Sequence, residues 1–132
     1  MEPKELILRW VECFNEHDAK RLSDLYHDDA ISLQVAIGTP LIGKAAILKD
    51  LQEFFTYTPD SYTKLENILA DGNRVALEWF GGGTFSANPS LPGKSYTLSG
   101  CGFFIVEEGK IKAQRGYWDK ATWFGQVGLS LE

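Results

Sequence analysis

The chain offers few side chains whose type and spacing would support metal or nucleophile chemistry. The histidines, His17 and His27, have no further ligand at useful spacing, so we expect no metal site, and we expect no cofactor. The cysteines, Cys13 and Cys101, fall in a helical pattern and a strand pattern. Such positions favour buried free thiols over a nucleophile or a disulfide framework.

The carboxylates are mostly at positions typical of structural roles. Four acids stand in breaks and turns, where carboxylates cap helices and reverse the chain: Asp28, Asp29, Asp60 and Asp71. Asp119 lies near the end of the last predicted strand. It is a weak candidate for catalysis, and the alternatives are an ion pair with a neighbouring arginine or a cap on the C-terminal tail.

Two amides and one phenol are the polar groups that best suit a binding site. Gln34 and Gln114 can each donate two hydrogen bonds and accept at a carbonyl oxygen, but neither can act as a general base. The alternative is that both cap strand ends or face solvent. Tyr26 could donate to an oxyanion, or could pack in the core with its hydroxyl satisfied locally.

Aromatic residues make up 13% of the chain, including four Trp and eight Phe, which is a large ring surface for one small domain. Trp10, Trp79, Phe104 and Trp118 could stack on a flat hydrophobic ligand. The alternative is an ordinary core. The pattern therefore indicates an apolar pocket wall or a core.

The elements that must position these residues follow from periodicity and turn signals. Apolar residues at helical spacing predict helices over 3–16 and 43–55, with a short helix between them that Asp18 caps and that carries Tyr26. Alternation and turns such as Asp71-Gly72-Asn73 predict strands. These strands cover 30–37, 62–70, 74–85, 95–106 and 110–119, and a partly apolar tail follows over 121–132.

Helices followed by a meander of long strands predict one α+β domain over residues 1–132. We expect a cone, in which a curved antiparallel sheet wraps around the N-terminal helices and an apolar pocket opens at one end. The formal charge of −5, with scattered basic residues, argues against nucleic acid as a partner. No apolar run would span a membrane, and the N-terminus lacks a secretory pattern, so we expect a cytoplasmic protein.

A series of short motifs runs along nearly the whole chain. These are Phe14-Asn15 with Asp18, Asp28-Asp29-Ala30, Gly43-Lys44-Ala45-Ala46-Ile47, Pro59-Asp60, Ala70 to Ala76, Gly83-Thr84, Glu108 to Ile111, Tyr117-Trp118-Asp119 and Gln126 to Leu129. In the order and spacing of these motifs, the chain resembles the SnoaL-like branch of the nuclear-transport-factor-2-like and ketosteroid isomerase-like superfamily. Polyketide cyclases, ketosteroid isomerases and limonene epoxide hydrolases belong to this superfamily.

The resemblance also implies where catalytic groups would stand. The oxyanion-hole positions of the isomerases fall on Trp10 and Gly102, and the general-base position falls on Gln34. The acid and histidine positions of the cyclases fall on Gly116 and Gly102. The paired positions of the epoxide hydrolases fall on or near Trp79 and Gly81. None of these residues can titrate, and the glycines would enlarge the pocket.

Period two then directs one set of strand residues inward. The predicted pocket contains Trp10, Phe14, Tyr26, Gln34, Trp79, Leu98, Phe104, Gln114 and Trp118. Its expected ligand is a small hydrophobic, cyclic, carbonyl-containing molecule. The chain would act on it as an isomerase, cyclase or hydrolase, or would be a non-catalytic binding or dimerisation module.

The opposite sheet face is expected to form a homodimer. Its residues would be Ala76, Glu78, Phe80, Phe103 and Ile105, and Glu78 would form an ion pair across the interface. An apolar stripe on an open sheet face needs to be covered.

Overall fold

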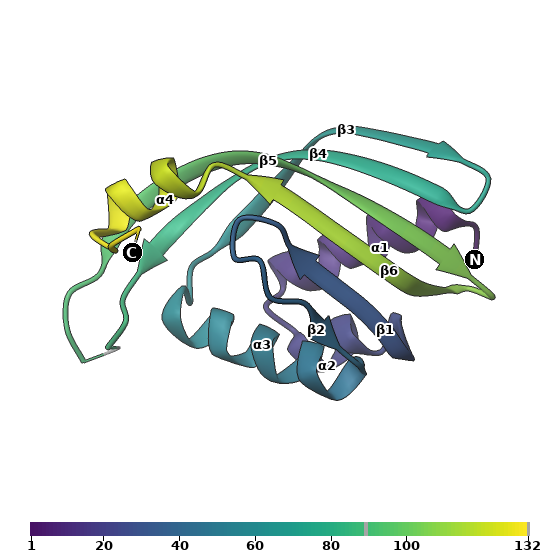
Figure 1. Ribbon diagram of the computed structural model, residues 1–132, viewed down its shortest axis with the longest axis horizontal. Coiled ribbons are helices and arrows are strands. Elements are labelled where there is room, and N and C mark those ends of the chain that lie inside the picture. The colour runs from purple at the N-terminus through teal and green to yellow at the C-terminus, as the bar shows by residue number, and fades with distance from the viewer. Residues whose placement is uncertain (89, 132) are drawn as a thin grey trace.

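The computed structural model of the chain describes residues 1–88 and 90–131 of 132. Helices lead and strands follow, with one further helix at the end (Figure 1). The order is α1 (Pro3–Asn15), α2 (Ala19–Ser23), β1 (Tyr26–Gln34), β2 (Leu41–Ile42), α3 (Lys44–Tyr57), β3 (Tyr62–Asp71), β4 (Arg74–Phe85), β5 (Lys94–Glu107), β6 (Lys110–Trp118) and α4 (Lys120–Val127). The predicted α+β class is confirmed.

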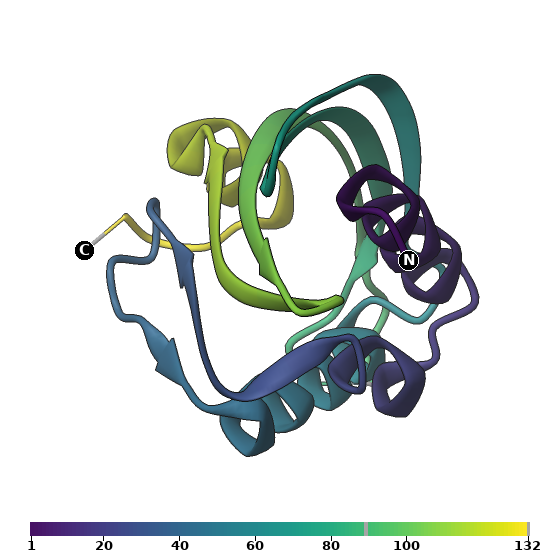
Figure 2. The same cartoon turned by 90° about the vertical axis from the view of Figure 1, so that its right-hand side faces the viewer.

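The strands form one curved, open sheet in the order β2-β1-β6-β5-β4-β3 (Figures 1 and 2). Strands β3 to β6 are an antiparallel meander, as predicted. Strand β1 differs, because it pairs with β6 in parallel. Parallel strands need a long crossover, and here the crossover contains β2, α3 and strands β3 to β5.

Helices α1, α2 and α3 lie against one face of the sheet, called the inner face below (Figure 1). Helix α1 buries Leu6 and Ile7, and α3 buries Ile47. The core cluster is closed by inner-face residues of the strands, namely Tyr26, Ala30, Val75, Leu77, Phe104, Val106 and Ile111. Burial of these apolar groups is the main force that holds helices and sheet together.

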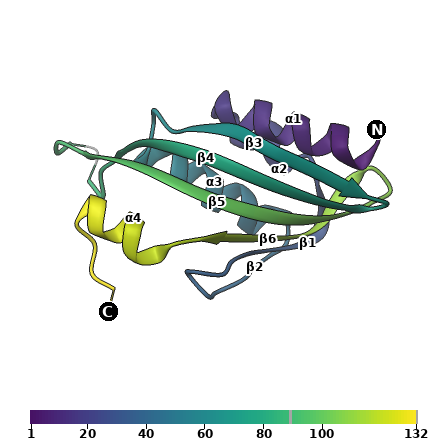
Figure 3. The same ribbon diagram turned by 90° about the horizontal axis from the view of Figure 1, so that it is seen from above.

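Helix α4 lies at the end of the molecule opposite the N-terminus (Figure 3). Its Trp123 makes edge contacts with Trp118, Phe85 and Tyr96, with centroid distances of 5.6, 5.3 and 5.7 Å. Sequence periodicity predicts only a partly apolar tail here, although Asp119 and Gly128 stand at the N-cap and the C-cap of the helix. Within the described residues, no helix is long and apolar enough to cross a lipid bilayer.

The second helix is shorter than predicted. It ends at Ser23, and Tyr26 begins β1. The helical spacing of Leu22, Leu25 and Tyr26 is misleading here, because Tyr26 pairs with Ile111 of β6. That pairing also starts β1 four residues before the predicted Ala30.

Candidate functional site

A hydrogen-bonded chain of side chains crosses the interior from α1 to β6. The indole Nε1 of Trp10 donates to the hydroxyl of Tyr26 over 2.9 Å, and that hydroxyl donates to Oε1 of Gln114. Ser32 also donates to this oxygen, over 3.4 Å. Tyr26 and Gln114 are 2% and 6% exposed, so these bonds lie inside the protein.

In this series of hydrogen bonds the donor and the acceptor of each bond are fixed. An indole N–H can only donate, so the Tyr26 oxygen accepts from Trp10 and its one proton goes to Gln114. Gln114 must therefore present its carbonyl oxygen to Tyr26 and its NH₂ group elsewhere. Donation from Tyr26 to a ligand would require Gln114 to give up its bond.

Burial raises the pKa of the Tyr26 phenol far above its ordinary value. The hydrogen bond from Trp10 opposes the rise, and the negative charge of Asp50 on α3 adds to it. Desolvation disfavours the phenolate, so Tyr26 stays a neutral hydroxyl. It holds Gln114 in place and is not a titrating base at ordinary pH.

Gln34 is held in the same way at the other end of the strand pair. The indole Nε1 of Trp118 donates to Oε1 of Gln34 over 2.9 Å. Gln34 is the register partner of Gly116, and Ser32 is the partner of Gln114, so the two glutamines are diagonal neighbours on the inner face. In both amides an aromatic donor occupies the carbonyl oxygen. Neither Nε2 has a hydrogen-bond partner among the described residues.

Aromatic rings surround the Trp10 end of this arrangement. Trp10 stacks on Phe14 and meets Phe104 edge-on, both with centroids 5.5 Å apart. Phe14 in turn contacts Phe54 and Phe55 of α3. Five predicted pocket residues thus come together, namely Trp10, Phe14, Tyr26, Phe104 and Gln114.

The remaining predicted pocket residues lie further along the inner face. Gln34 and Trp118 form the pair described above, next to Trp123. Trp79 packs against the core cluster, and Leu98 is half-buried opposite Gly81. The nine residues share one face of the sheet and its helices, and seven of them form two groups, one around Tyr26 and Gln114 and one around Gln34 and Trp118.

The glycines at the inherited catalytic positions do not all leave space. Gly102 and Gly116 are register partners on β5 and β6. A β-carbon on Gly102 would meet its nearest atoms at 3.6 Å, which is ordinary contact. A β-carbon on Gly116 would lie 2.9 Å from Cδ of Gln34, so the Gln34 amide fills that space. The expectation that both glycines enlarge the pocket is therefore wrong at Gly116.

Asp119 is the N-cap of α4. Its carboxylate accepts from the backbone N–H of Ala121 and Thr122, at 3.0 and 3.4 Å, and from the Thr122 hydroxyl at 3.0 Å. The Thr122 hydroxyl is the largest of the influences that lower the pKa of this carboxyl. Of the alternatives for Asp119, the geometry is that of a cap on the C-terminal segment.

Asp50 is an acid that the sequence interpretation missed. It lies on the side of α3 that carries Ile47 and Phe54, three residues after the first and four before the second. Loss of surrounding water raises the pKa of its carboxyl, and the charge of Glu53 adds to the rise. Its residue surface is nevertheless exposed, a combination that fits a side chain surrounded by protein but still open to water. The helical period that predicted the apolar face of α3 could have found it.

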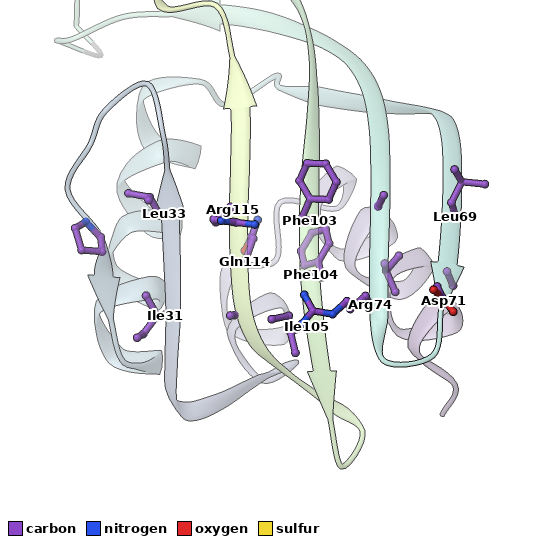
Figure 4. Close-up of a pocket in the computed structure, with 15 residues that line it drawn as sticks. Ile31, Leu33, Leu69, Asp71, Arg74, Phe103, Phe104, Ile105, Gln114 and Arg115 are labelled. Carbon is purple, nitrogen blue, oxygen red and sulfur yellow. The ribbon is translucent and has the colours of Figure 1, made fainter.

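A hollow of about 660 Å³ lies on the opposite, outer face of the sheet (Figure 4). Its walls come from β1, β3, β4, β5 and β6, and they are mostly apolar. Phe103, Ile105 and Ala76, three of the predicted dimer residues, line it, with Arg74 and Arg115 beside them. Of the nine predicted pocket residues, Phe104 and Gln114 border this hollow. It is thus a different place from the predicted interior pocket.

Known structures share this architecture along almost the full chain. A protein of Catenulispora acidiphila with a ketosteroid isomerase-like fold, in complex with trimethylamine, superposes with a TM-score of 0.84 at 16% identity, covering 96% of this chain and 95% of that one. A candidate polyketide cyclase of Pseudomonas putida gives 0.79 at 28% identity, covering 96% and 98%. One from Streptomyces antibioticus gives 0.81 at 25% identity, covering 98% and 100%.

The sequence itself matches a family model. The match spans residues 7–114, from the first helix to Gln114, and the model describes a SnoaL-like domain. The match and the shared architecture agree on the fold, which is the nuclear-transport-factor-2-like one. The chain therefore belongs to the SnoaL-like domain family.

Proposed function

We propose that this protein binds a small hydrophobic molecule with a carbonyl group at the inner face of its sheet. The NH₂ groups of Gln34 and Gln114 would donate to the carbonyl oxygen. One observation carries the proposal: Trp118 and Tyr26 occupy the carbonyl oxygens of these amides, which leaves donors and not acceptors for a ligand.

The surroundings fit the apolar part of such a ligand. Trp10, Phe14 and Phe104 offer flat ring surfaces beside Gln114. Specific small-molecule sites combine apolar walls with a few placed polar groups, which is the composition found here. Similar structures named as polyketide cyclases, at 28% and 27% identity, support a cyclic, carbonyl-containing ligand.

Catalysis on the bound ligand is the second part of the proposal. Isomerisation, cyclisation or hydrolysis of a carbonyl compound needs a titratable group in reach of the ligand. The inherited positions Trp10, Gln34, Gly102 and Gly116 supply none. A non-catalytic binding module remains the alternative, and it is favoured if no other acid or base serves the site.

The binding proposal can be tested with a matched pair of molecules. 2-Tetralone is a flat bicyclic ketone, and tetralin is the same bicycle without the carbonyl. Quenching of tryptophan fluorescence measures both affinities, since Trp10 and Trp118 lie at the site. We expect the ketone to bind more tightly, by about tenfold or more for one satisfied donor.

Two isosteric variants identify the donors. Gln114→Glu and Gln34→Glu keep an oxygen for Tyr26 and Trp118 but replace each NH₂ donor with a second oxygen. Both should remove the preference for the ketone. Gln52→Glu, on the exposed side of α3, is the control for the added charge. Equal affinity for ketone and hydrocarbon in the parent protein would refute the proposal.

We also propose that the outer face forms a homodimer around its hollow. Leu69, Ile31 and Phe103 are 64%, 47% and 45% exposed there, which is a large apolar surface to leave in water. Arg74 and Arg115 lie in the wall of this hollow, and Glu78 is exposed further along β4, the strand that carries Arg74. A two-fold arrangement would place charges of both signs on each side of the interface.

A further inference from the structure

We propose that Asp50 of α3 is the catalytic residue that moves a proton to and from the ligand at the inner face. The inference rests on the proposed function, since it assigns chemistry to the ligand that the glutamines would hold. It places the working carboxylate on α3, whereas the inherited catalytic positions of this sequence are in α1 and in the strands.

The position of Asp50 on its helix is the first support. Residues three and four apart share one side of a helix. Asp50 is thereby grouped with Ile47, which is buried in the core cluster, and with Phe54, whose ring contacts Phe14 of α1. Leu51, next to it, is packed against the same core cluster. Helix α3 lies against the sheet (Figure 1), and Asp50 is on the flank of its apolar side, where the residue is still exposed.

The second support is what lies opposite. Asp50 is within electrostatic reach of the Tyr26 hydroxyl, which donates to Gln114. Tyr26 thus connects the charge of Asp50 with the amide that would hold the carbonyl. A proton carrier has to stand beside the carbon that it serves, with the oxygen held by separate donors.

The third support is that Asp50 takes part in no interaction that would give it a structural role in the described part of the chain. Among the described residues it makes no hydrogen bond and no ion pair. Other acids of the chain have partners, such as Asp60 with Thr84, Asp119 with Thr122 and Asp24 with Lys20. Glu53 is the charged group that bears on Asp50, and it has the same sign. An unpaired carboxylate that loses water in this way keeps the basicity that proton transfer requires.

The reaction can be written so that it balances. The Asp50 carboxylate takes a proton from the carbon next to the carbonyl and becomes a carboxylic acid. The electron pair of the broken C–H bond moves to the carbonyl oxygen, giving an enolate that accepts from the Gln34 and Gln114 amides. Asp50 then returns the proton to a carbon of the same molecule. The net change is a shift of one proton within the molecule or, when the Asp50 acid first exchanges its proton with water, the replacement of that proton by one from the solvent.

Hydrogen–deuterium exchange of 2-tetralone in D₂O measures this step directly by NMR. Parent protein, Asp50→Asn and Glu53→Gln are compared at equal fractions of bound ketone, with binding measured by fluorescence on the same samples. Asp50→Asn should bind 2-tetralone with little change but should lose about 100-fold or more in the protein-dependent exchange rate. Glu53→Gln should keep the rate that the parent reaches at pH values above the pKa of Asp50.

The pH profile adds a readout that a structural role of Asp50 would not change. The exchange rate should rise with pH through the raised pKa of the Asp50 carboxyl. Because the charge of Glu53 contributes to that pKa, Glu53→Gln should move this rise to lower pH. If Asp50→Asn binds 2-tetralone and exchanges it as fast as the parent, the inference is wrong. If 2-tetralone does not bind the parent, the proposed function fails first, and the role of Asp50 falls with it.

Discussion

Trp118 donates to Gln34 across 2.9 Å, and the amide that it holds fills the place where a side chain on Gly116 would begin. The absence of a side chain at residue 116 is therefore matched by the presence of a glutamine at residue 34. The two positions are register partners on β1 and β6, so they act as one unit of packing. This pair makes the first prediction.

Gly116→Ala should lower the free energy of unfolding by about 1–3 kcal/mol, since the new methyl group would collide with the Gln34 amide. Urea denaturation measures the loss. Gly102→Ala is the matched control, because Gly102 is the cross-strand partner of Gly116 and a β-carbon there meets only ordinary contacts at 3.6 Å. In the double variant Gln34→Ala/Gly116→Ala the collision is removed, so the two losses should not add. Additive losses would contradict this packing.

Tyr26→Phe should destabilise the protein by about 1–3 kcal/mol at neutral pH. The substitution leaves the Trp10 N–H without its acceptor and the buried Gln114 oxygen without its main donor. Chemical denaturation at pH 7 measures this difference. Tyr117→Phe, on the exposed side of β6, removes a hydroxyl without such partners and should cost little.

Tyr26→Phe should also change how the free energy of unfolding depends on pH in the alkaline range. Burial raises the pKa of Tyr26 in the folded state above the unfolded value of about 10. The folded state then holds its proton longer than the unfolded state, so stability is fully present below about pH 10 and falls above it. The gap between parent and Tyr26→Phe should narrow over that range. Tyr96, whose pKa burial raises to about 12, is present in both proteins and cancels. A gap that stays constant would show that Tyr26 ionises freely.

Asp119→Ala should loosen α4 without unfolding the domain. The carboxylate satisfies the N–H groups of Ala121 and Thr122, for which the described part of the chain offers no other acceptor at the start of the helix. Amide hydrogen exchange in α4 should speed up, while exchange in β3 to β6 stays slow. Asp119→Asn keeps a capping oxygen and should behave much like the parent. The pKa of the carboxyl is lowered, so the cap should persist down to acidic pH and weaken only as the pH falls through that value.

Phe103→Arg should convert the expected dimer to a monomer. The ring is 45% exposed on the outer face, where it meets Tyr117 at 5.9 Å, and a charge there would have to be buried at an interface. Analytical ultracentrifugation measures the mass in solution. Leu8→Arg, on the exposed side of α1, adds the same charge away from this face and should leave the dimer intact. A monomeric parent protein would refute the dimer.

The inner face of the sheet could be predicted from the sequence because alternation along a strand has a fixed period. Gly102 and Gly116, both expected to point inward, prove to be direct partners across β5 and β6. Gln114 and Phe104 are buried on that same face. Once one residue of each strand is placed, the period of two places the others.

Contacts between residues that are far apart in the sequence could not be predicted in this way. Tyr26 has the spacing of a helical residue, and only its pairing with Ile111 makes it the start of a strand. The outer hollow depends on the curvature of five strands together, which no single segment encodes. Asp50 was missed for another reason: an acid within a helix is normally expected to face water, and Asp50 is exposed although it lies three residues after the buried Ile47 and four before Phe54.

The parallel pairing of β1 with β6 has a consequence for the order of assembly. Synthesis proceeds from the N-terminus, so the ribosome releases β1 long before β6 exists. Until residues 110–118 emerge, Tyr26, Ser32 and Gln34 have no neighbouring strand on that side. The nascent chain must therefore keep one edge of β1 unpaired through most of translation, and contacts so distant in sequence are slow to form. The last strand to be made completes both the sheet and the pair of amides at its centre.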